Sequence, residues 1–360
     1  MQIQVNINSF DDGGQQNMKK PLCIGILGAA KVAHRAVIEP AKKLDGVEVF
    51  GVAARDRAKA EKFARDYGIQ AIFPSYDALI ESEHIDAVYI PLANHLHTPW
   101  ILKAAQAKKP VLVEKPICLS LEEFDAIEAA VAANGVPVLE AVMVQHHPWQ
   151  KKLQDIVETG IYGKVKSIRT RLTLQFCEED NPGNYRFSPE QGGGAFFDLG
   201  TYWIQLVQIC LGLQPDVIAA QATLNKPGGV DVAFEARLGF SNGALAEFDC
   251  SFDRPFEANH CLELEKAHIK IRNFFRPLFG IQSMSLDVYN LDRGEREIIK
   301  FPVQNYYINQ LEFFVQMLAG REQNLPLSQS RDRVKIVEAI HRVAIHGSSD
   351  SCNRCVETGL

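Results

Sequence analysis

The residues best suited to chemistry are a lysine near the end of an apolar run and an acid–tyrosine pair further along the chain. Lys115 lies two positions after the apolar residues 111–113, and Asp198 and Tyr202 are four residues apart. A spacing of four places both side chains on one face of a helix. A lysine ammonium can polarise a carbonyl, and a tyrosine hydroxyl can deliver a proton. We therefore predict that Lys115, Asp198 and Tyr202 are catalytic.

The three residues have different predicted roles. Lys115 supplies positive charge, Tyr202 is the proton donor, and Asp198 orients Lys115 or substrate hydroxyls. A free phenol has a pKa of about 10, so we expect the nearby ammonium to lower the pKa of Tyr202. The structural alternatives are a surface lysine, a tyrosine whose hydroxyl packs on a backbone group, and an acid that caps a helix.

A glycine turn follows the first apolar run, residues 22–27. It fits the G-x-G-x-x-G/A pattern of dinucleotide turns, in which Gly28 permits the sharp turn and Ala33 permits close packing of helix on sheet. Ala30 stands where the usual second glycine lets the backbone approach a pyrophosphate, so a plain strand-to-helix turn is the alternative. The predicted cofactor residues of this turn are Gly28, Ala29, Ala30, Lys31, Val32 and Ala33.

The end of the second apolar run indicates which dinucleotide binds. Arg55 lies about 20 residues past the turn, where an acid would hold the ribose 2′-hydroxyl of NAD. A guanidinium suits a 2′-phosphate instead, with Arg57 as support, so we predict NADP as the cofactor. Asp56 leaves NAD as an alternative, although its position also fits the cap of the next helix.

These residues fall at the ends of predicted elements in the first part of the chain. From residue 21 to residue 149, short apolar runs alternate with helical stretches. This alternation predicts a Rossmann dinucleotide-binding domain of α/β class, a doubly wound parallel sheet with helices on both faces. The predicted strands are residues 22–27, 47–53, 71–73, 87–90, 111–113 and 136–144, and a helix is expected over 30–44.

Residues 150–348 show a different period. Alternating apolar and polar residues predict an α+β domain with a large open, mostly antiparallel sheet, which would bind substrate. An open sheet needs covering, so a homodimer or homotetramer through this sheet is predicted. The predicted strands are residues 165–175, 217–224, 230–240, 244–252 and 261–271, and the predicted helices are 150–158, 195–211, 305–319 and 331–346.

Composition excludes several classes of protein. The net charge of −6 offers no basic excess for nucleic acid, and no apolar run reaches the length of about 18 residues that spans a bilayer. Residues 1–20 lack the apolar core of a signal peptide and are predicted to be a flexible tail. In the polar tail, residues 349–360, Cys352 and Cys355 have no second cysteine pair, so no metal site is predicted. We expect a cytoplasmic protein without nucleic-acid or membrane partners.

Two further motifs follow successive predicted strands: Asn94-His95-Leu96-His97 and Glu114-Lys115-Pro116. With the Gly28 turn before them and the stretch 192–202 after them, the chain has four motifs in a fixed order. Together they resemble the Gfo/Idh/MocA oxidoreductases over residues 21–345. The tyrosine at 202, where many members have histidine, resembles the branch of dimeric dihydrodiol dehydrogenases, glucose–fructose oxidoreductases and sugar-nucleotide ketoreductases. The resemblance implies a cis Lys115-Pro116 bond. It also implies cofactor contacts by Asn94, His97, Glu114, Lys115 and Pro116.

The expected reaction is reversible hydride transfer, dependent on NADP(H), at a carbinol or carbonyl carbon of a sugar, sugar derivative or cyclic polyol. Arg186 either holds an anionic group or pairs with an acid, and His97 either lines the nicotinamide pocket or caps a helix. Alternatives are a redox-assisted elimination with retained NAD and a dinucleotide-sensing regulatory protein. The predicted substrate residues are His147, Tyr185, Arg186, Asp198 and Tyr202, with Tyr306 and Gln310 as distal pocket residues.

Overall fold

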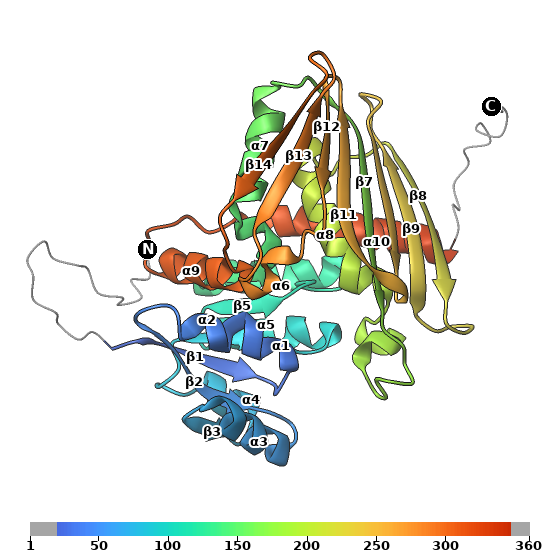
Figure 1. Cartoon of the computed structure of the whole chain (residues 1–360). Coiled ribbons are helices and arrows are strands. Elements are labelled where there is room, and N and C mark those ends of the chain that lie inside the picture. Colours follow the sequence, from blue (N-terminus) through green and yellow to red (C-terminus); the bar gives the residue numbers. More distant parts are fainter. Residues whose placement is uncertain (1–19, 347–360) are drawn as a thin grey trace, which may run out of the picture.

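The computed structural model describes residues 20–346, so the predicted tail positions 1–19 and 349–360, including Cys352 and Cys355, lie outside the described residues. Two sheets organise this part of the chain (Figure 1). The N-terminal sheet with its helices (blue to cyan) lies beneath the larger C-terminal sheet (green to orange). Both domains of the predicted fold class are present.

The N-terminal sheet has six parallel strands in the order β3-β2-β1-β4-β5-β6. The strand order reverses between β1 and β4, and ligands of such sheets bind outside the carboxyl ends of the strands at this point. β1 is buried on both faces, as its uninterrupted apolar sequence requires. The strands are β1 (Leu22–Leu27), β2 (Val47–Ala53), β3 (Ala71–Phe73), β4 (Ala87–Ile90), β5 (Val111–Glu114) and β6 (Val138–Ala141).

Local sequence sets the ends of several helices of this domain. Asp56, Ser75 and Ser120 each accept a backbone N–H at a helix N-terminus, so Asp56 serves as the helix cap that its position suggested. Gly68 and Gly135 end two helices with positive φ. The helical segments are α1 (Lys31–Ala33), the π-helical turn η1 (His34–Ile38), α2 (Glu39–Ala41), α3 (Arg57–Tyr67), α4 (Tyr76–Ile80), η2 (Asn94–Leu96), α5 (His97–Gln106) and α6 (Leu121–Asn134).

The C-terminal sheet has eight strands in the order β14-β13-β12-β11-β7-β10-β9-β8. Neighbours are antiparallel except β7 and β10, which run parallel. The sheet is therefore mostly antiparallel, as predicted. Its strands are β7 (Val165–Gln175), β8 (Val217–Leu224), β9 (Asp231–Gly239), β10 (Leu245–Ser251), β11 (Asp253–Leu264), β12 (Ala267–Ile271), β13 (Met284–Asn290) and β14 (Glu295–Phe301).

Helices cover one face of this sheet (Figure 1). α8 packs on β7, β9 and β10, α10 packs along β8, and α9 contacts η1 and α2 of the first domain. One cluster of buried apolar side chains extends through both domains, and a second cluster lies mainly in the first domain. The helical segments are η3 (Met143–His146), α7 (Pro148–Thr159), η4 (Tyr185–Phe187), η5 (Pro189–Gln191), α8 (Ala195–Leu211), η6 (Arg276–Phe279), α9 (Tyr306–Leu318) and α10 (Leu327–His346).

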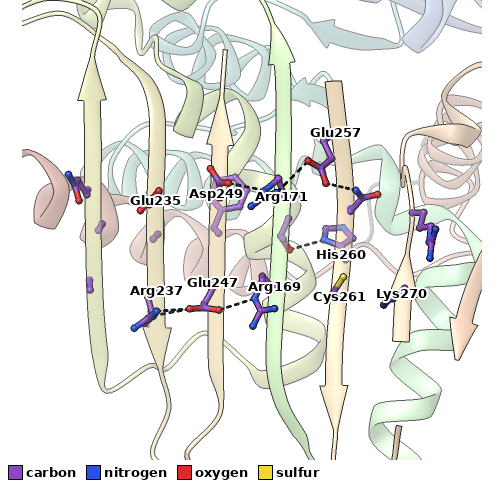
Figure 2. A pocket seen from close by; sticks show the side chains of 18 residues that line it. Arg169, Arg171, Glu235, Arg237, Glu247, Asp249, Glu257, His260, Cys261 and Lys270 are labelled. Carbon is purple, nitrogen blue, oxygen red and sulfur yellow. Dashed lines mark hydrogen bonds and ion pairs between the residues drawn. The ribbon is translucent and has the colours of Figure 1, made fainter. Parts of the chain in front are cut away.

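The other face of the sheet is open and charged. Figure 2 shows arginines and acids side by side across β9, β10 and β7. The carboxylate of Glu247 accepts hydrogen bonds from Arg237 Nη2 (2.7 Å) and Arg169 Nε (3.1 Å), and Asp249 accepts one from Arg171 Nε (2.9 Å). These side chains border a shallow hollow of 790 Å³. Charged pairs thus occupy the middle of this face, beside exposed apolar residues such as Val217 and Leu245.

Candidate active site

A cavity of 680 Å³ lies where the carboxyl ends of the parallel strands face α8 and the loop that follows β7. Loops from four separate regions of the sequence meet there, which is the arrangement expected at the switch point of a doubly wound sheet. The predicted site residues that border it are Ala30, Lys31, Val32, Glu114, Lys115, Tyr185, Arg186, Asp198 and Tyr202.

Lys115 is anchored by Asp198. Its Nζ donates to Asp198 Oδ1 at 2.8 Å and to the Asp198 main-chain oxygen at 2.6 Å. Both side chains are only 11% exposed. An ammonium has three N–H donors, so one remains available after these two bonds. Asp198 therefore orients Lys115, one of the two roles predicted for it, and the Lys115-Pro116 bond is cis as the resemblance implied.

Arg186 completes an ionic cluster on the same carboxylate. Its Nε donates to Asp198 Oδ2 at 2.8 Å and its Nη2 to Oδ1 at 3.0 Å, a bidentate pair. The guanidinium also stacks over the ring of Tyr185, 4.8 Å from its centroid. Burial raises the pKa of Asp198, but the charges of Arg186 and Lys115 outweigh it and hold that pKa well below the usual range. Of the two predictions for Arg186, the structure shows the pair with an acid.

Tyr202 lies beside this cluster, with Lys115 Nζ 5.5 Å from the centroid of its ring. Within residues 20–346, no hydrogen bond occupies its hydroxyl, although the residue borders the cavity. Burial raises the pKa of Tyr202 above its ordinary value, and the negative charges of Asp198 and Glu114 add to that rise. The pKa of Tyr202 is therefore raised and not lowered as expected, because burial and these two acids outweigh the cations nearby.

The N-terminus of α8 fixes Asp198 and Tyr202 against the cavity. Gly194 precedes the helix with φ +118°, and a Cβ there would come within 2.1 Å of Asp231 Oδ1. Asp231, on β9, accepts the N–H of Phe196 at 2.7 Å. Burial raises the pKa of Asp231 to about 6. The acid that caps α8 is therefore Asp231 from the sheet, not Asp198, and nothing in the local sequence spacing pointed to it.

Glu114 lies below the cavity in a buried pair. It accepts the hydroxyl hydrogen of Tyr89 at 2.6 Å. Burial raises the pKa of Glu114, and the bond from Tyr89 and the charge of Lys115 offset only part of that rise. Glu114 thus sits at the floor of the cavity next to Lys115.

Asn94 and His97 position loops rather than border the cavity. Asn94 Nδ2 donates to the Gly192 oxygen at 2.8 Å, which ties the loop after β4 to the glycine stretch before α8. The ring nitrogens of buried His97 face the carbonyl oxygens of Pro116 (2.7 Å) and Leu92 (3.0 Å). Burial lowers the pKa of His97 although both carbonyls act to raise it. His97 thereby joins the loop after β4 to the loop that carries Lys115.

The turn after β1 has the geometry that a dinucleotide needs. Gly28 has φ +103°, which side chains rarely adopt, and its N–H donates to the Ala53 oxygen at 2.7 Å. Ala30 has φ −86° and an extended conformation, so alanine fits there without strain. The cations Lys31 and Arg35 border the cavity, and neither has an ion pair within residues 20–346. These features fit the phosphates of a dinucleotide.

Arg55 and Arg57 differ in availability. Both are exposed beyond the end of β2. Arg57 Nε donates to Glu61 Oε1 at 2.9 Å, whereas Arg55 has no ion pair in the described part of the chain. Arg55 therefore has a guanidinium free for a phosphate, and Arg57 is already paired.

Three predicted pocket residues lie elsewhere. His147 accepts the N–H of Trp149 at the start of α7 and borders a second cavity, not the one beside Lys115. Tyr306 donates its hydroxyl to the Phe274 oxygen in the core, and Gln310 is fully buried. Among residues 20–346, no group of three histidine, cysteine or acidic side chains is placed to hold a metal ion. No helix of this part is long and apolar enough to cross a membrane.

The cavity also contains residues that the sequence did not single out. Arg35 reaches it from the π-helical turn η1, Tyr307 from α9, and Phe176 and Phe275 from loops at the ends of strands. Tyr307 directly follows Tyr306, so the helical pattern was recognised one position early. Nothing in the spacing of Arg35 distinguished it from a surface arginine.

The fold and this cavity define an oxidoreductase with a dinucleotide-binding Rossmann domain. Residues 22–142 match the family model described as "Oxidoreductase family, NAD-binding Rossmann fold", and residues 150–267 match the GFO/IDH/MocA C-terminal domain. The chain is 30% identical over 331 residues to an uncharacterized oxidoreductase, ORF334, of Rhizobium meliloti, which covers 90% of this chain and 97% of the relative. The chain therefore belongs to the Gfo/Idh/MocA family.

Several relatives are named for reactions on sugars or sugar nucleotides, and others are named trans-1,2-dihydrobenzene-1,2-diol dehydrogenases. A D-xylose 1-dehydrogenase (NADP(+)) of Haloferax volcanii is 28% identical, over 91% of this chain and 99% of the relative. A dTDP-3,4-didehydro-2,6-dideoxy-α-D-glucose 3-reductase of Streptomyces antibioticus is 29% identical, over 89% and 96%. The structure of a 3-ketoreductase from Actinomadura kijaniata with NADP and TDP-benzene superposes with a TM-score of 0.83 at 24% identity, over 90% of this chain and 98% of that chain. This last likeness confirms the fold.

Proposed function

We propose that the protein is an NADP(H)-dependent oxidoreductase that transfers a hydride reversibly at a carbinol or carbonyl carbon of a sugar, sugar derivative or cyclic polyol. The observation that carries the proposal is the cluster of Lys115, Asp198 and Arg186 beside the unpartnered hydroxyl of Tyr202, at the carboxyl edge of the Rossmann sheet. The names of the sugar dehydrogenase and sugar-nucleotide reductase relatives support the substrate class.

Each residue of the cluster has a task in this reaction. NADPH held by the Gly28 turn and Arg55 would supply the hydride for the substrate carbon. The remaining N–H of Lys115 donates to the substrate oxygen and stabilises the negative charge that develops on it. Tyr202 gives that oxygen its proton, and in the oxidative direction the phenolate takes it back. Asp198 and Arg186 hold Lys115 in place throughout.

The groups that would hold cofactor and substrate follow from the same geometry. The turn from Gly28 to Ala33 faces the phosphates, and the free guanidinium of Arg55 pairs with the 2′-phosphate that distinguishes NADP. Tyr185 and Arg186 present ring and guanidinium surfaces to the sugar from the loop after β7.

A second copy of the chain is the partner that we propose for the open face of the C-terminal sheet. Positive and negative side chains alternate across β7, β9 and β10 on this face. A second copy, rotated by a two-fold axis, could place its acids opposite these arginines and its arginines opposite these acids. A homodimer or homotetramer through the sheet follows from this proposal.

The reaction is tested by cofactor fluorescence with NADPH and NADH, followed by turnover on a panel of keto sugars, sugars and cyclic polyols. We expect tighter binding of NADPH than of NADH and turnover of at least one panel member. NADPH binding without turnover across the panel would favour the sensor alternative. NAD that stays with the protein through gel filtration would favour the elimination alternative.

A further inference from the structure

A second cavity lies further along α8, beside the second half of the helix, whereas the first lies beside its N-terminal turns. Its volume is 1190 Å³, against 680 Å³ for the cavity beside Lys115, and the two share no bordering residue. It is bordered by η3, α7, the second half of α8, α9, the loop after α9 and the start of α10, and it is open to solvent. Neither the proposed reaction nor the cofactor uses this space.

The walls of this cavity are rich in side-chain amides. Eight of its twenty bordering residues are glutamines, and Asn309 adds a ninth amide. Most of these amides bond a neighbour, as Gln150 does with Gln205 and Gln154 with Glu158. An amide has two N–H donors and two acceptor lone pairs, so each keeps capacity for the donor and acceptor of a sugar hydroxyl. The rings of His146 and Phe313 lie 4.6 Å apart in the wall and supply an apolar surface for C–H groups.

The charges of the cavity do not favour an anion. Lys151 and Arg333 are its two cations, and three glutamates accompany them. Arg333 is in addition paired with Glu140, whose Oε2 lies 2.9 Å from Arg333 Nη2. Because the positive charge is already compensated, a neutral ligand suits this cavity better than a phosphate or carboxylate.

Two buried N–H groups at this cavity have no acceptor. His147 Nδ1 accepts the Trp149 N–H, so the ring hydrogen is on Nε2, which has no partner. Burial lowers the pKa of His147 to about 4, which keeps the ring neutral. The Nε of Arg333 is likewise buried without a partner. Both residues border the cavity, but these two N–H groups lie behind its surface, and the His147 ring packs against Phe301 and Tyr306. A ligand in the cavity therefore contacts the amides of the wall first.

The cavity is connected to the loop and the helix that carry the proposed catalytic residues. Arg333 donates to Glu140, and the other oxygen of Glu140 accepts the N–H of Ile117 at 3.1 Å, two residues after Lys115. Arg333 Nη1 also donates at 3.2 Å to Gln208 on α8, the helix of Asp198 and Tyr202. A ligand that moves Arg333 therefore acts on both ends of the Lys115–Asp198 pair.

We propose that this cavity is a second binding site, for a neutral monosaccharide or polyol, distinct from the site of hydride transfer. Its ligand class rests on the amides, the rings and the compensated charges of the wall, and so does not depend on the proposed reaction. Occupancy acts on the catalytic cluster through Arg333 and Glu140.

The test measures binding of myo-inositol and D-glucose by calorimetry to NADPH-saturated Lys115→Met protein, in which turnover cannot contribute. Gln154→Leu and Gln316→Leu each remove one amide from opposite walls, α7 and α9, and Gln70→Leu removes an exposed glutamine of the first domain as the matched control. We expect saturable binding that each cavity variant weakens about 3- to 10-fold, the effect of one lost hydrogen bond, and that Gln70→Leu leaves unchanged. NADPH affinity and the melting temperature should stay constant in all of them.

Binding that neither cavity variant weakens, or no saturable binding of either compound, would overturn the proposal. Citrate that binds more tightly than both compounds would show that the ligand class is wrong. The measurement involves no turnover. Absence of turnover on the sugar panel would therefore count against the proposed function and not against this second site.

Discussion

A single carboxylate organises the chemistry of the cavity. Asp198 accepts two hydrogen bonds from Arg186 and one from Lys115, while its main-chain oxygen accepts a second bond from Lys115. Three charged groups thus share a net charge of one, close to the hydroxyl of Tyr202. This arrangement keeps Lys115 oriented. The charge of Asp198 also raises the pKa of Tyr202 and so opposes the effect of the ammonium on the phenol.

Removing the anion is predicted to acidify Tyr202. Its pKa is raised by burial, then by Asp198 and Glu114, so the phenol stays protonated above its ordinary pKa. Reductive kcat/KM of the wild type should therefore fall only at strongly alkaline pH. In Asp198→Asn one raising charge is gone and Lys115 is uncompensated, so the alkaline limb should move to lower pH. A pH profile of kcat/KM measures this, and a limb that stays in place or moves upward contradicts it.

The choice of dinucleotide is predicted to depend on Arg55. A charge-assisted bidentate contact contributes roughly 1.5–3 kcal/mol, so Arg55→Ala should reduce the preference for NADPH over NADH by about 10- to 100-fold. Arg57→Ala is the matched control, because Arg57 is already paired with Glu61. Fluorescence titration with both cofactors gives the two dissociation constants. Equal losses for NADPH and NADH in Arg55→Ala would mean that the residue is structural.

At the scale of residues, the sequence predicted those side chains whose position is set by the end of a strand or the face of a helix. Lys115 follows a strand, and Asp198 and Tyr202 share a helix face, so all three meet at the cavity. His147 was not predictable in the same way, because the short helix η3 turns the chain after β6 and directs the side chain to the second cavity. The pKa of Tyr202 was beyond the sequence, because it depends on how Asp198 and Lys115 pair in space.

At the scale of elements, α8 is placed by a contact from the sheet. Asp231 on β9 accepts the N–H of Phe196, and the glycine before the helix leaves room for its carboxylate. A helix N-terminus favours the carboxylate, whereas burial favours the neutral acid. The pKa of about 6 shows that burial is the stronger effect here.

This competition predicts a pH dependence of stability. The pKa of Asp231 is higher in the folded than in the unfolded protein, so folding favours the protonated carboxyl. This stabilisation is fully present below the unfolded pKa, where both states are protonated. It is lost as pH rises through about 6, because the buried carboxyl must then ionise. Asp231→Asn lacks this loss, so the free energy of unfolding of the variant relative to wild type should rise by up to about 3 kcal/mol between pH 4 and pH 7. Urea unfolding at both pH values measures it. A difference that stays constant or falls would show that the helix end holds the carboxylate ionised.

Most elements were predictable because their apolar period is clear, and most exceptions have physical causes. Residues 261–271 were predicted as one strand, but a turn at residues 265–266 divides them between β11 and β12. β13 and β14 were not predicted. β14 is a largely exposed edge strand without a buried apolar face, whereas β13 alternates buried and exposed residues and its pattern was overlooked. The predicted helix 30–44 ends at residue 41 and contains the π-helical turn η1, which directs Arg35 to the cavity.

At the scale of the whole molecule, one face of the large sheet carries helices and the site, and the other carries rows of charged pairs across its middle strands (Figure 2). The pairs of Arg169, Arg171 and Arg237 have arginines that are 55–61% exposed, so they contribute little to the stability of a single chain. Their regular alternation is instead available to a second copy of the sheet.

Light scattering is predicted to give two or four times 40.1 kDa at micromolar concentration. Arg171→Glu places a third acid beside Asp249 and Glu257, so it should weaken the assembly and leave NADPH binding intact. High salt should also weaken it, because the charges are exposed. A wild-type mass of 40.1 kDa under these conditions would contradict the proposed interface.

The account as a whole depends on Tyr202 as proton donor with Lys115 as its charged partner. The most direct measurement is the kcat of Tyr202→Phe, on a substrate that the panel identifies, together with its NADPH dissociation constant. General acid catalysis contributes about 10²- to 10⁴-fold, so kcat should fall within that range while NADPH binds as in the wild type. Lys115→Met should lose at least as much, and the double variant far less than the product of both losses. A Tyr202→Phe enzyme with nearly unchanged kcat would contradict the account.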